Sequence, residues 1–371
     1  MFLTHYNKSG RTENIKFQFH KKNLLFYLDR EFYLPQVNDS MRVLQMGSGK
    51  RKRLAERRNR KPGIQKNDEL NVSYFNNDYR AMEKESWILS RILEKDVPQD
   101  KEDANSKISN LIKGRYYDNF KPDNSDDEAQ LLAYEAYSYT GNKRRETALR
   151  ALDTSENCAD AYVIIAEMER DLLKRKILFE KGVKAGRNYL GENIFKEYKG
   201  KFWGLTRTRP FMRAMDGLAA TLWSLGEYEQ AGSVYEEILD LNPMDNQGVR
   251  YNLLIIYIET RSLNKAEDLI RKYEDDYRAD LLYNKALLLF IKTGINLETK
   301  RVIRDAFKLN HFIPPMLLGR IRLPELQMYI SPGSKEEAAN YTVTSIAAWH
   351  KVPNAIQWLQ KEYDLYSGSL S

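Results

Sequence analysis

One short segment constrains the fold of this chain more than any other. It runs from Gly217 to Pro243 and reads GLAATLWSLGEYEQAGSVYEEILDLNP. Helical patterns of apolar residues lie on both sides of Gly226, and Asn242-Pro243 follows the second pattern. A single helix pair of this kind cannot bury both of its apolar faces, so further pairs must stack against it. We therefore predict an all-α fold built from helix pairs in series.

The pattern recurs downstream at a constant spacing. Ala231 and Ala266 are 35 residues apart, and the bulky residues Tyr235 and Ile270 each follow four positions later. A small side chain lets two helix axes approach, and the large one fills the next layer of the core. A period near 34 residues is typical of tetratricopeptide repeats. The clearest predicted repeats are 213–242, 246–275 and 279–309.

The same reasoning divides the chain into five regions and predicts a short right-handed superhelix over about 126–363. A methionine at position 46 stands almost directly before a basic run, so the native start could lie there and residues 1–45 would then be an upstream extension. The predicted regions are 1–46, of uncertain structure; 47–68, a basic linker; 69–125, helical and irregular; 126–310, tetratricopeptide-like repeats with an insertion at 186–210; and 311–371, C-terminal capping helices.

Helix signals outside the clear repeats are more local. A helix is expected at Tyr79–Leu93, followed by a polar break at Pro98–Ser106. Ser125 is the expected N-cap of the first repeat helix, because acidic residues follow it directly. Two final helices, Ser334–His350 and Val352–Tyr363, are expected to cap the end of the solenoid.

Positive charge is concentrated in one segment. Residues 50–66 contain nine Lys or Arg residues and one acid, a net charge of +8, whereas the whole chain carries +7. Such a segment would bind nucleic acid or another polyanion through counterion release, or it would be only a solvated linker. The side chains predicted to contact a polyanion are Lys50, Arg51, Lys52, Arg53, Arg57, Arg58, Arg60 and Lys61.

The chain lacks the motifs of common catalytic sites. The segment Met46–Arg53 resembles a phosphate-binding loop, but Leu44 replaces the first glycine and Arg51 replaces the magnesium-binding Ser or Thr. No histidine has a second His or Cys at metal-ligand spacing. We therefore predict no catalytic residues, no metal and no cofactor, and classify the chain as a non-enzyme.

The compartment is predicted from cysteine and apolar content. Cys158 is the single cysteine, so no intrachain disulfide is possible, and a reducing cytoplasm is the simplest location. Apolar runs reach only six residues, as in Ala286–Ile291, so no integral membrane insertion is expected. The oligomeric state is left open.

A second group of residues predicts a binding surface. If the repeats stack normally, the first helix of each pair lines the concave face, where guanidinium groups would clamp a carboxylate or phosphate and tryptophan would anchor apolar groups. The alternative is that Arg209 and Arg250 form internal ion pairs and that Trp223 belongs to the core. The predicted groove residues are Trp203, Arg207, Arg209, Arg213, Arg250, Tyr251 and Asn252.

Between Asn157 and Leu359 the chain also resembles a known family. The residues that carry the resemblance form six segments, which read NCADAYVIIAE, KFWGLTRTRPFMRA, GLAATLWSLGEYEQA, LNPMDNQGVRY, NHFIPPMLLG and SKEEAANYTVTSIAAWHKVPNAIQWL. They are similar to bacterial tetratricopeptide-like proteins related to the suppressor-of-tumorigenicity-seven family. This resemblance implies a helical-repeat interaction protein and supplies no catalytic reaction.

These observations favour a non-catalytic scaffold or adaptor that binds a peptide or protein in its concave groove. The alternative is an RNA- or ribosome-associated factor that uses the basic linker 50–66.

Overall fold

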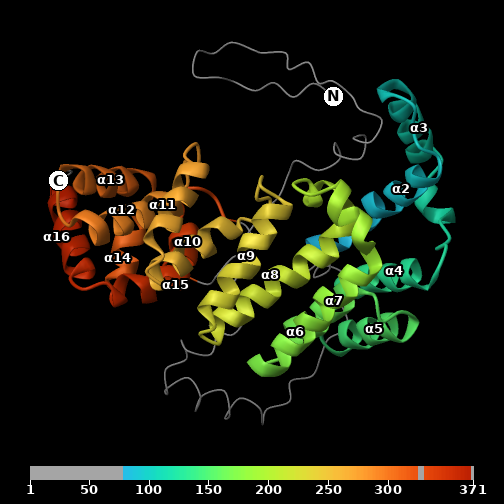
Figure 1. Ribbon diagram of the computed structural model, residues 1–371, viewed down its shortest axis with the longest axis horizontal. Coiled ribbons are helices and arrows are strands. Elements are labelled where there is room, and N and C mark those ends of the chain that lie inside the picture. Colours follow the sequence, from blue (N-terminus) through green and yellow to red (C-terminus); the bar gives the residue numbers. More distant parts are fainter. Residues whose placement is uncertain (1–77, 325–329, 369–371) are drawn as a thin grey trace, which may run out of the picture.

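The computed structural model describes residues 78–324 and 330–368. Every regular element within those ranges is a helix, and no strand occurs there (Figure 1). The predicted all-α fold class is therefore confirmed. The N-terminal region 1–46 and the basic linker 47–68 lie outside the described residues, so the predictions made for them remain predictions.

Five helix pairs follow one another along the chain, and each pair packs against the next. The pairs are α4 (Ser125–Tyr137) with α5 (Gly141–Thr154), α6 (Ala159–Met168) with α7 (Leu172–Glu197), α8 (Arg209–Ser224) with α9 (Tyr228–Leu241), α10 (Val249–Glu259) with α11 (Leu263–Lys272), and α12 (Ala279–Thr293) with α13 (Leu297–Leu309). We call the surface formed by α4, α6, α8, α10 and α12 the first-helix face.

The residues that define the repeat behave as their spacing predicts. Ala231 and Ala266 are completely buried, as is Tyr235. Gly226 follows α8 with a φ angle of 80°, and Gly294 follows α12 with a φ angle of 68°. A positive φ costs glycine little, so each glycine ends a first helix and turns the chain into the second.

The predicted insertion 186–210 is made of elements that pack on the repeat core. It begins inside α7, which changes direction at Gly191, where φ is 68° and ψ is 159°. Two short 3₁₀ helices follow, η6 (Phe202–Gly204) and η7 (Thr206–Thr208). The ring of Phe195 lies 5.0 Å from that of Phe202 and 5.2 Å from that of Phe211 in α8. The segment is therefore held by an aromatic cluster at the start of α8.

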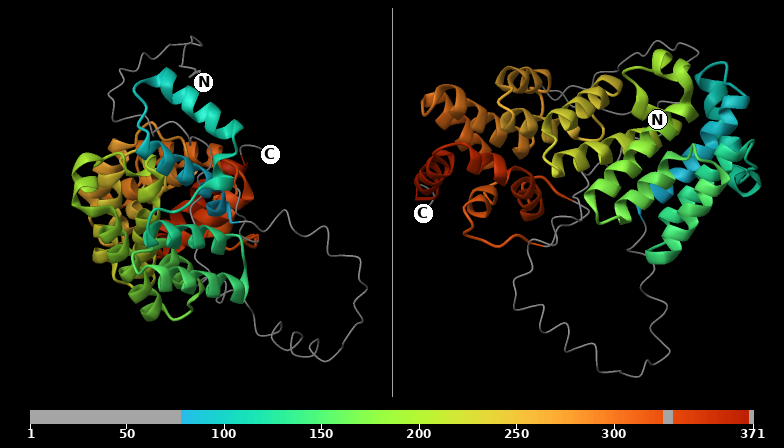
Figure 2. Two further views of the ribbon diagram at one scale, coloured as in Figure 1. Left: turned by 90° about the vertical axis from the view of Figure 1, so that its right-hand side faces the viewer. Right: turned by 60° about the horizontal axis from the view of Figure 1, so that its bottom comes forward.

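The C-terminal helices turn back towards the repeats. After the short α14 (Ile313–Leu317), α15 (Lys335–Lys351) packs on α10, and α16 (Ala355–Gly368) packs on α13 (Figures 1 and 2). The two final helices are thus present as predicted, although only α16 packs on the last repeat helix, α13.

The region before the repeats contains η4 (Tyr79–Met82), α2 (Glu83–Lys95), α3 (Lys101–Lys113) and η5 (Tyr116–Asn119). The predicted helix at Tyr79–Leu93 is confirmed. The polar break at Pro98–Ser106 was wrong in part, because Asp100 caps a helix there by accepting a hydrogen bond from the amide of Asp103. Helix α4 is capped by Asn124 and not by Ser125, since the Asn124 side chain accepts from the amide of Asp127.

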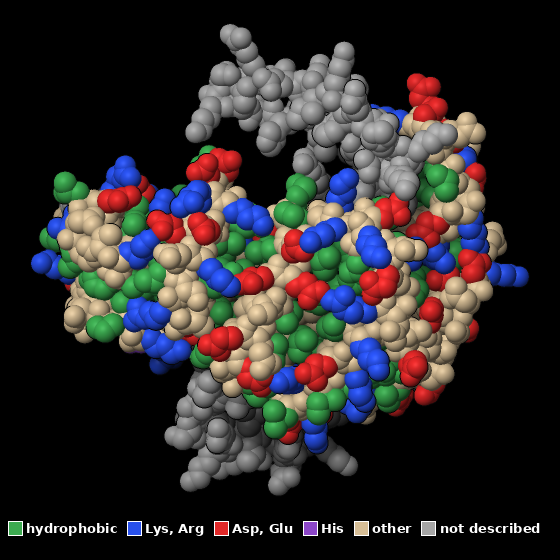
Figure 3. Space-filling view, viewed as in Figure 1, with side chains coloured by type: hydrophobic (Ala, Val, Ile, Leu, Met, Phe, Trp, Pro, Cys, Tyr) green, Lys and Arg blue, Asp and Glu red, His purple; other side chains and the backbone are tan. Residues whose placement is uncertain are grey.

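Charges of both signs are distributed over the surface. Lys and Arg side chains alternate with Asp and Glu over the described part of the face shown in Figure 3. Several of them join neighbouring second helices, such as Lys265 of α11 with Glu236 of α9.

Candidate functional site

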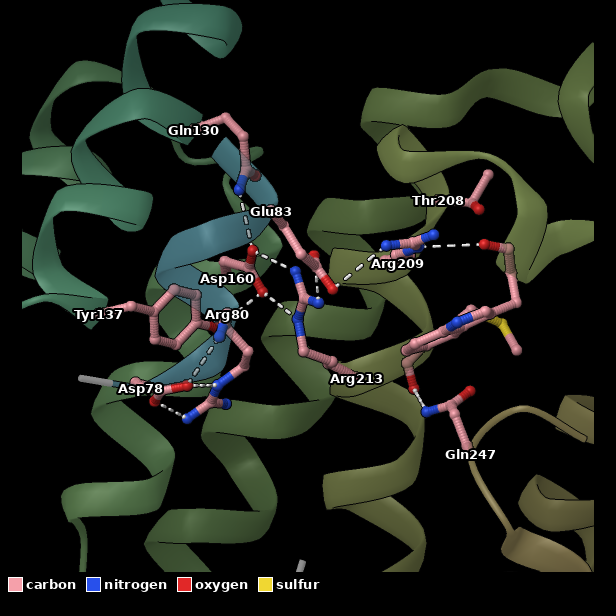
Figure 4. A network of polar contacts seen from close by, with 12 residues as sticks. Asp78, Arg80, Glu83, Gln130, Tyr137, Asp160, Thr208, Arg209, Arg213 and Gln247 are labelled. Atoms are coloured by element: carbon pink, nitrogen blue, oxygen red, sulfur yellow. Dashed lines mark hydrogen bonds and ion pairs between the residues drawn. The ribbon is translucent and has the colours of Figure 1, made fainter. Parts of the chain in front are cut away.

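The first-helix face of the early repeats is covered by a segment of the chain itself. We call residues 78–95, which comprise η4 and α2, the N-terminal arm. It contacts α4, α6 and α8, the first helices of three consecutive pairs. Figure 4 shows the polar contacts at this junction. The candidate site is therefore a face of the repeats that is covered by a helical segment of the same chain.

Arg213 is the centre of the polar network. Its Nε lies 2.9 Å from Asp160 Oδ1 and its Nη2 lies 2.7 Å from Asp160 Oδ2, which makes a bidentate pair between α8 and α6. Its Nη1 donates to Glu83 of the N-terminal arm over 2.8 Å. Asp160 also accepts from Gln130 and Tyr137 of α4, each over 2.8 Å. One arginine thus joins the arm to the repeats.

Arg209, one helical turn before Arg213, also contacts the carboxylate of Glu83. Its Nη1 lies 3.4 Å from Glu83, and its Nε donates to the backbone carbonyl of Trp203 over 3.0 Å. The side chains of Arg209 and Trp203 are buried, and the guanidinium lies 5.2 Å from the Trp203 ring. The Trp203 ring therefore packs against the Arg209 guanidinium.

Arg80 fixes the start of the arm. Its guanidinium pairs with Glu167 of α6, with an Nη1–Oε1 distance of 2.6 Å, and with Asp78 over 2.5 Å. It lies 4.2 Å from the centre of the Tyr137 ring, which adds a cation–π contact. Arg144 of α5 also reaches Glu167, over 3.2 Å. The arm therefore carries a base and an acid that each meet an opposite charge on the repeats.

The central pair stays charged in spite of its burial. Burial alone would raise the pKa of Asp160, but the Arg213 guanidinium and the hydrogen bonds to its oxygens hold that pKa below its usual range. Burial alone would lower the pKa of Arg213, but Asp160 and Glu83 raise it well above its usual range. Both groups therefore remain charged inside the protein.

A second polar cluster lies one repeat further on. Arg250 pairs with Asp245 and with Asp276, each over 2.8 Å, and the Tyr251 hydroxyl donates to Asp276 over 2.7 Å. Asn252 donates to the Tyr235 hydroxyl over 3.3 Å. This cluster joins α10 to the loops before and after the pair formed by α10 and α11, so its side chains also bind groups of the chain itself.

The predicted groove residues thus fall into two groups. Trp203, Arg209 and Arg213 come together beneath the N-terminal arm, and Arg207 lies beside its far end, 3.5 Å from Glu94. Arg250, Tyr251 and Asn252 belong to the second cluster. Their role in binding a partner remains a prediction, and the eight cations of residues 50–61 lie outside the described residues.

Sequence reasoning did not foresee that the arm itself would dock on this face. A signal was available, because Arg80, Glu83, Trp87 and Arg91 recur at three- or four-residue spacing along one helical face. The helix was predicted from its apolar residues alone, and those do not indicate which surface it covers.

Two further groups have altered acidity. Burial and the neighbouring carboxylate of Asp245 raise the pKa of Asp216 in α8 to about 7. Burial also raises the pKa of the Cys158 thiol, which donates to the carbonyl of Ala129 over 3.5 Å. A thiol that stays protonated is a poor nucleophile, so we assign Cys158 a packing role.

The enclosed cavity beside the arm is small. A cavity of about 10 Å³, lined by Gln130, Cys158, Tyr189 and Arg207 among others, has room for roughly one water molecule. Within 78–324 and 330–368, no three His, Cys, Asp or Glu side chains are placed to share a metal ion. In the same ranges no helix combines the length and the apolar character needed to cross a membrane.

Comparison with known proteins gives weak but consistent similarity. The chain matches no protein-family profile. It is 22% identical over 242 residues to proteins described as "Suppressor of tumorigenicity 7 protein-like" from Bos taurus and Mus musculus, and 22% identical over 247 residues to the Homo sapiens protein. The match covers 58% of this chain and 43% of the bovine protein, so the chain spans less than half the length of the curated relatives it matches. The resemblance to this family is thereby confirmed for animal proteins, and the bacterial relationship remains a prediction.

Proposed function

We propose that the chain is a non-catalytic helical-repeat protein that binds a peptide or protein partner on its first-helix face, as a scaffold or adaptor. One observation carries this proposal. Three consecutive first helices contact a single helical segment, the N-terminal arm, through Tyr137 of α4, Glu167 of α6 and Arg213 of α8. Stacked repeats commonly use such an extended surface for binding.

The chemistry of the face supports a protein ligand. Arg209 and Arg213 were predicted to clamp a carboxylate, and they meet the carboxylate of Glu83. Glu167 meets the guanidinium of Arg80. A surface with fixed charges of both signs selects a ligand of complementary charge pattern, which a polypeptide supplies more readily than a uniformly charged nucleic acid.

Affinity purification of the chain from its own cells, followed by mass spectrometry, tests this proposal. We expect protein partners that remain after nuclease treatment and that are reduced in the variants Arg213→Ala and Arg250→Ala. Arg271→Ala is the matched control, because that arginine is exposed and pairs with Asp268 one turn away. If Arg213→Ala loses helix content by circular dichroism, Arg213→Lys replaces it, since lysine keeps the charge but not the bidentate geometry. A partner list unchanged by these substitutions would count against the first-helix face.

A second candidate function rests on charge. Nine cations and one acid within residues 50–66 favour binding to RNA or another polyanion. Deletion of residues 47–66 should then abolish salt-dependent RNA binding while the helix content stays unchanged. RNA binding that survives the deletion would exclude this segment as its cause.

A further inference from the structure

The N-terminal arm docks on the repeats as a helical ligand would. Its contact residues Arg80, Glu83, Trp87 and Arg91 lie three or four positions apart and share one face of the segment. This is the pattern of an amphipathic helix laid along a groove. Trp87 is completely buried. Buried tryptophan and arginine side chains are the usual anchors of protein interfaces.

The repeats retain their own polar contacts on the face beneath the arm. Arg213 keeps both hydrogen bonds to Asp160, and Arg209 keeps its bond to the carbonyl of Trp203. Asp160 keeps its bond from Gln130. None of these contacts involves the arm, so the face is organised for a ligand without it. A preorganised surface binds without first paying an ordering cost.

The aromatic contact between the arm and the repeats is incompletely satisfied. The rings of Trp87 and Tyr134 lie 6.0 Å apart. Trp87 Nε1 and the Tyr134 hydroxyl are both buried, and neither has a hydrogen-bond partner among the described residues. Each such group costs about 1–3 kcal/mol. The arm is therefore held less firmly than its buried surface suggests.

The arm itself is well buried, but the chain that follows it is not. It is followed by α3, in which only Ala104 is buried. Figure 1 and the left view of Figure 2 show α3 standing away from the stacked pairs. Movement of the arm would therefore disturb few contacts of the helix pairs other than its own.

From these contacts we infer that residues 78–95 are an internal ligand, which must leave the first-helix face before a helix of a partner protein binds there. The partner helix presents a basic residue, a carboxylate three positions later and a large aromatic ring four positions after that, as Arg80, Glu83 and Trp87 do. The inference rests on the proposed function and adds the chemistry of the partner and the regulation of the site.

A labelled synthetic peptide of residues 78–95 tests the inference. Its binding to the 371-residue chain is compared with its binding to the same chain carrying Glu83→Ala and Trp87→Ala. The apparent affinity for the peptide is the intrinsic affinity multiplied by the fraction of molecules whose face is not covered by the arm. We therefore expect the variant to bind the peptide at least about 10-fold more tightly than the wild-type chain. A peptide that itself carries Glu83→Gln and Trp87→Ala should not bind either protein.

A second version of the experiment leaves the residues of the interface unchanged. A specific protease site is inserted after Gly114, between α3 and η5, and the cleaved wild-type protein is incubated with the labelled peptide. We expect the peptide to replace the cleaved fragment while the repeats keep their helix content, and this result stands even if the double variant fails to fold.

Two results would overturn the inference. A cleaved fragment that never exchanges with the peptide would make the arm a permanent part of the fold. A double variant or cleaved protein that forms a stable dimer by exchanging arms would make this face an interface between copies. Neither result bears on whether affinity purification finds protein partners, so the proposed function is tested separately.

Discussion

The two ends of the first-helix face are covered by segments of different chemistry. The N-terminal arm meets α4, α6 and α8 through ion pairs, such as Glu83 with Arg213 over 2.8 Å. Helix α15 packs on α10 and contacts α12 through Tyr341, whose ring lies 5.5 Å from that of Tyr283, and it also carries the completely buried Trp349. The arm contact combines a charge pattern with a buried apolar side, whereas the α15 contact completes the main hydrophobic core.

The core of the molecule follows the same division. Tyr341, Trp349 and Trp358 belong to one continuous apolar cluster that runs from α7 to α16. Trp87 and Ile88 of the arm belong to a smaller cluster with residues of α4, α5 and α6. The hydroxyl of Tyr341 links α15 to α12 by donating to Asn284 and accepting from Trp349 Nε1. Helix α15 therefore belongs to the main core, whereas the arm packs in the smaller one.

The largest expected effect comes from the apolar end. Trp349→Ala should lower the free energy of unfolding by about 3–5 kcal/mol, because it removes a completely buried ring from the core. Denaturant unfolding followed by circular dichroism measures this. The control is Leu297→Ala, whose side chain is 89% exposed and which should change stability by less than about 0.5 kcal/mol. An equally small effect of Trp349→Ala would remove the proposed distinction between the two ends.

Arg213→Met should cost about 2–4 kcal/mol, somewhat less than the loss of Trp349. The substitution keeps much of the side-chain volume but leaves the buried carboxylate of Asp160 without its bidentate partner. The same denaturant titration gives the value. Unchanged stability would mean that the pair contributes nothing to the fold.

The pH dependence of unfolding isolates the contribution of Asp160. Its folded pKa lies below its usual value, so the stabilisation it provides is complete above the unfolded pKa, near 4, and is lost as the pH falls through the folded pKa. Wild-type stability should therefore decline in this acid range, and the decline should be smaller in Arg213→Met. Parallel pH profiles for the two proteins would contradict the assignment.

Asp216→Asn should stabilise the protein. Its folded pKa of about 7 lies above the usual value, so the carboxyl group is best tolerated when protonated and destabilises the fold increasingly as the pH rises from about 4 to 7. Because Asp216 is partly exposed, we expect a gain on the order of 1–2 kcal/mol at pH 8 and little change at pH 4. Thermal unfolding at the two pH values checks this, and a gain independent of pH would contradict the stated cause.

The smallest effect is expected at the surface. Lys265→Ala breaks the pair with Glu236, whose two side chains are 61% and 40% exposed, and should change stability by less than about 0.5 kcal/mol. A cost as large as that of Arg213→Met would mean that burial is not what separates important from unimportant ion pairs in this molecule.

The sequence predicts the repeats well because their signals are local. The small residues Ala231 and Ala266 lie in neighbouring second helices, and Gly226 lies between the two helices of one pair. The burial of both alanines and the positive φ of Gly226 are confirmed. The coverage of the first-helix face could not be read in this way. Glu83 and Arg213 are 130 positions apart, and no helical period links them.

The part of the candidate site that was predicted also depends on local position in the repeat. Arg213 was expected to clamp a carboxylate because of its place in a first helix, and the chemistry of that expectation matches its contact with Glu83. What the sequence did not indicate is that this carboxylate comes from the chain itself. Position in the repeat predicts which side chains face a ligand, but long-range folding decides which ligand is present.

Hydrogen–deuterium exchange of the wild-type protein tests the central claim most directly, because it compares the two covering segments without any substitution. We expect the amides of α2 to exchange through a local opening of lower free energy than those of α15, with α8 remaining protected throughout. If α2 and α15 exchange together, at the rate of global unfolding, the N-terminal arm is not a releasable ligand and the contrast between the two ends of the face is wrong.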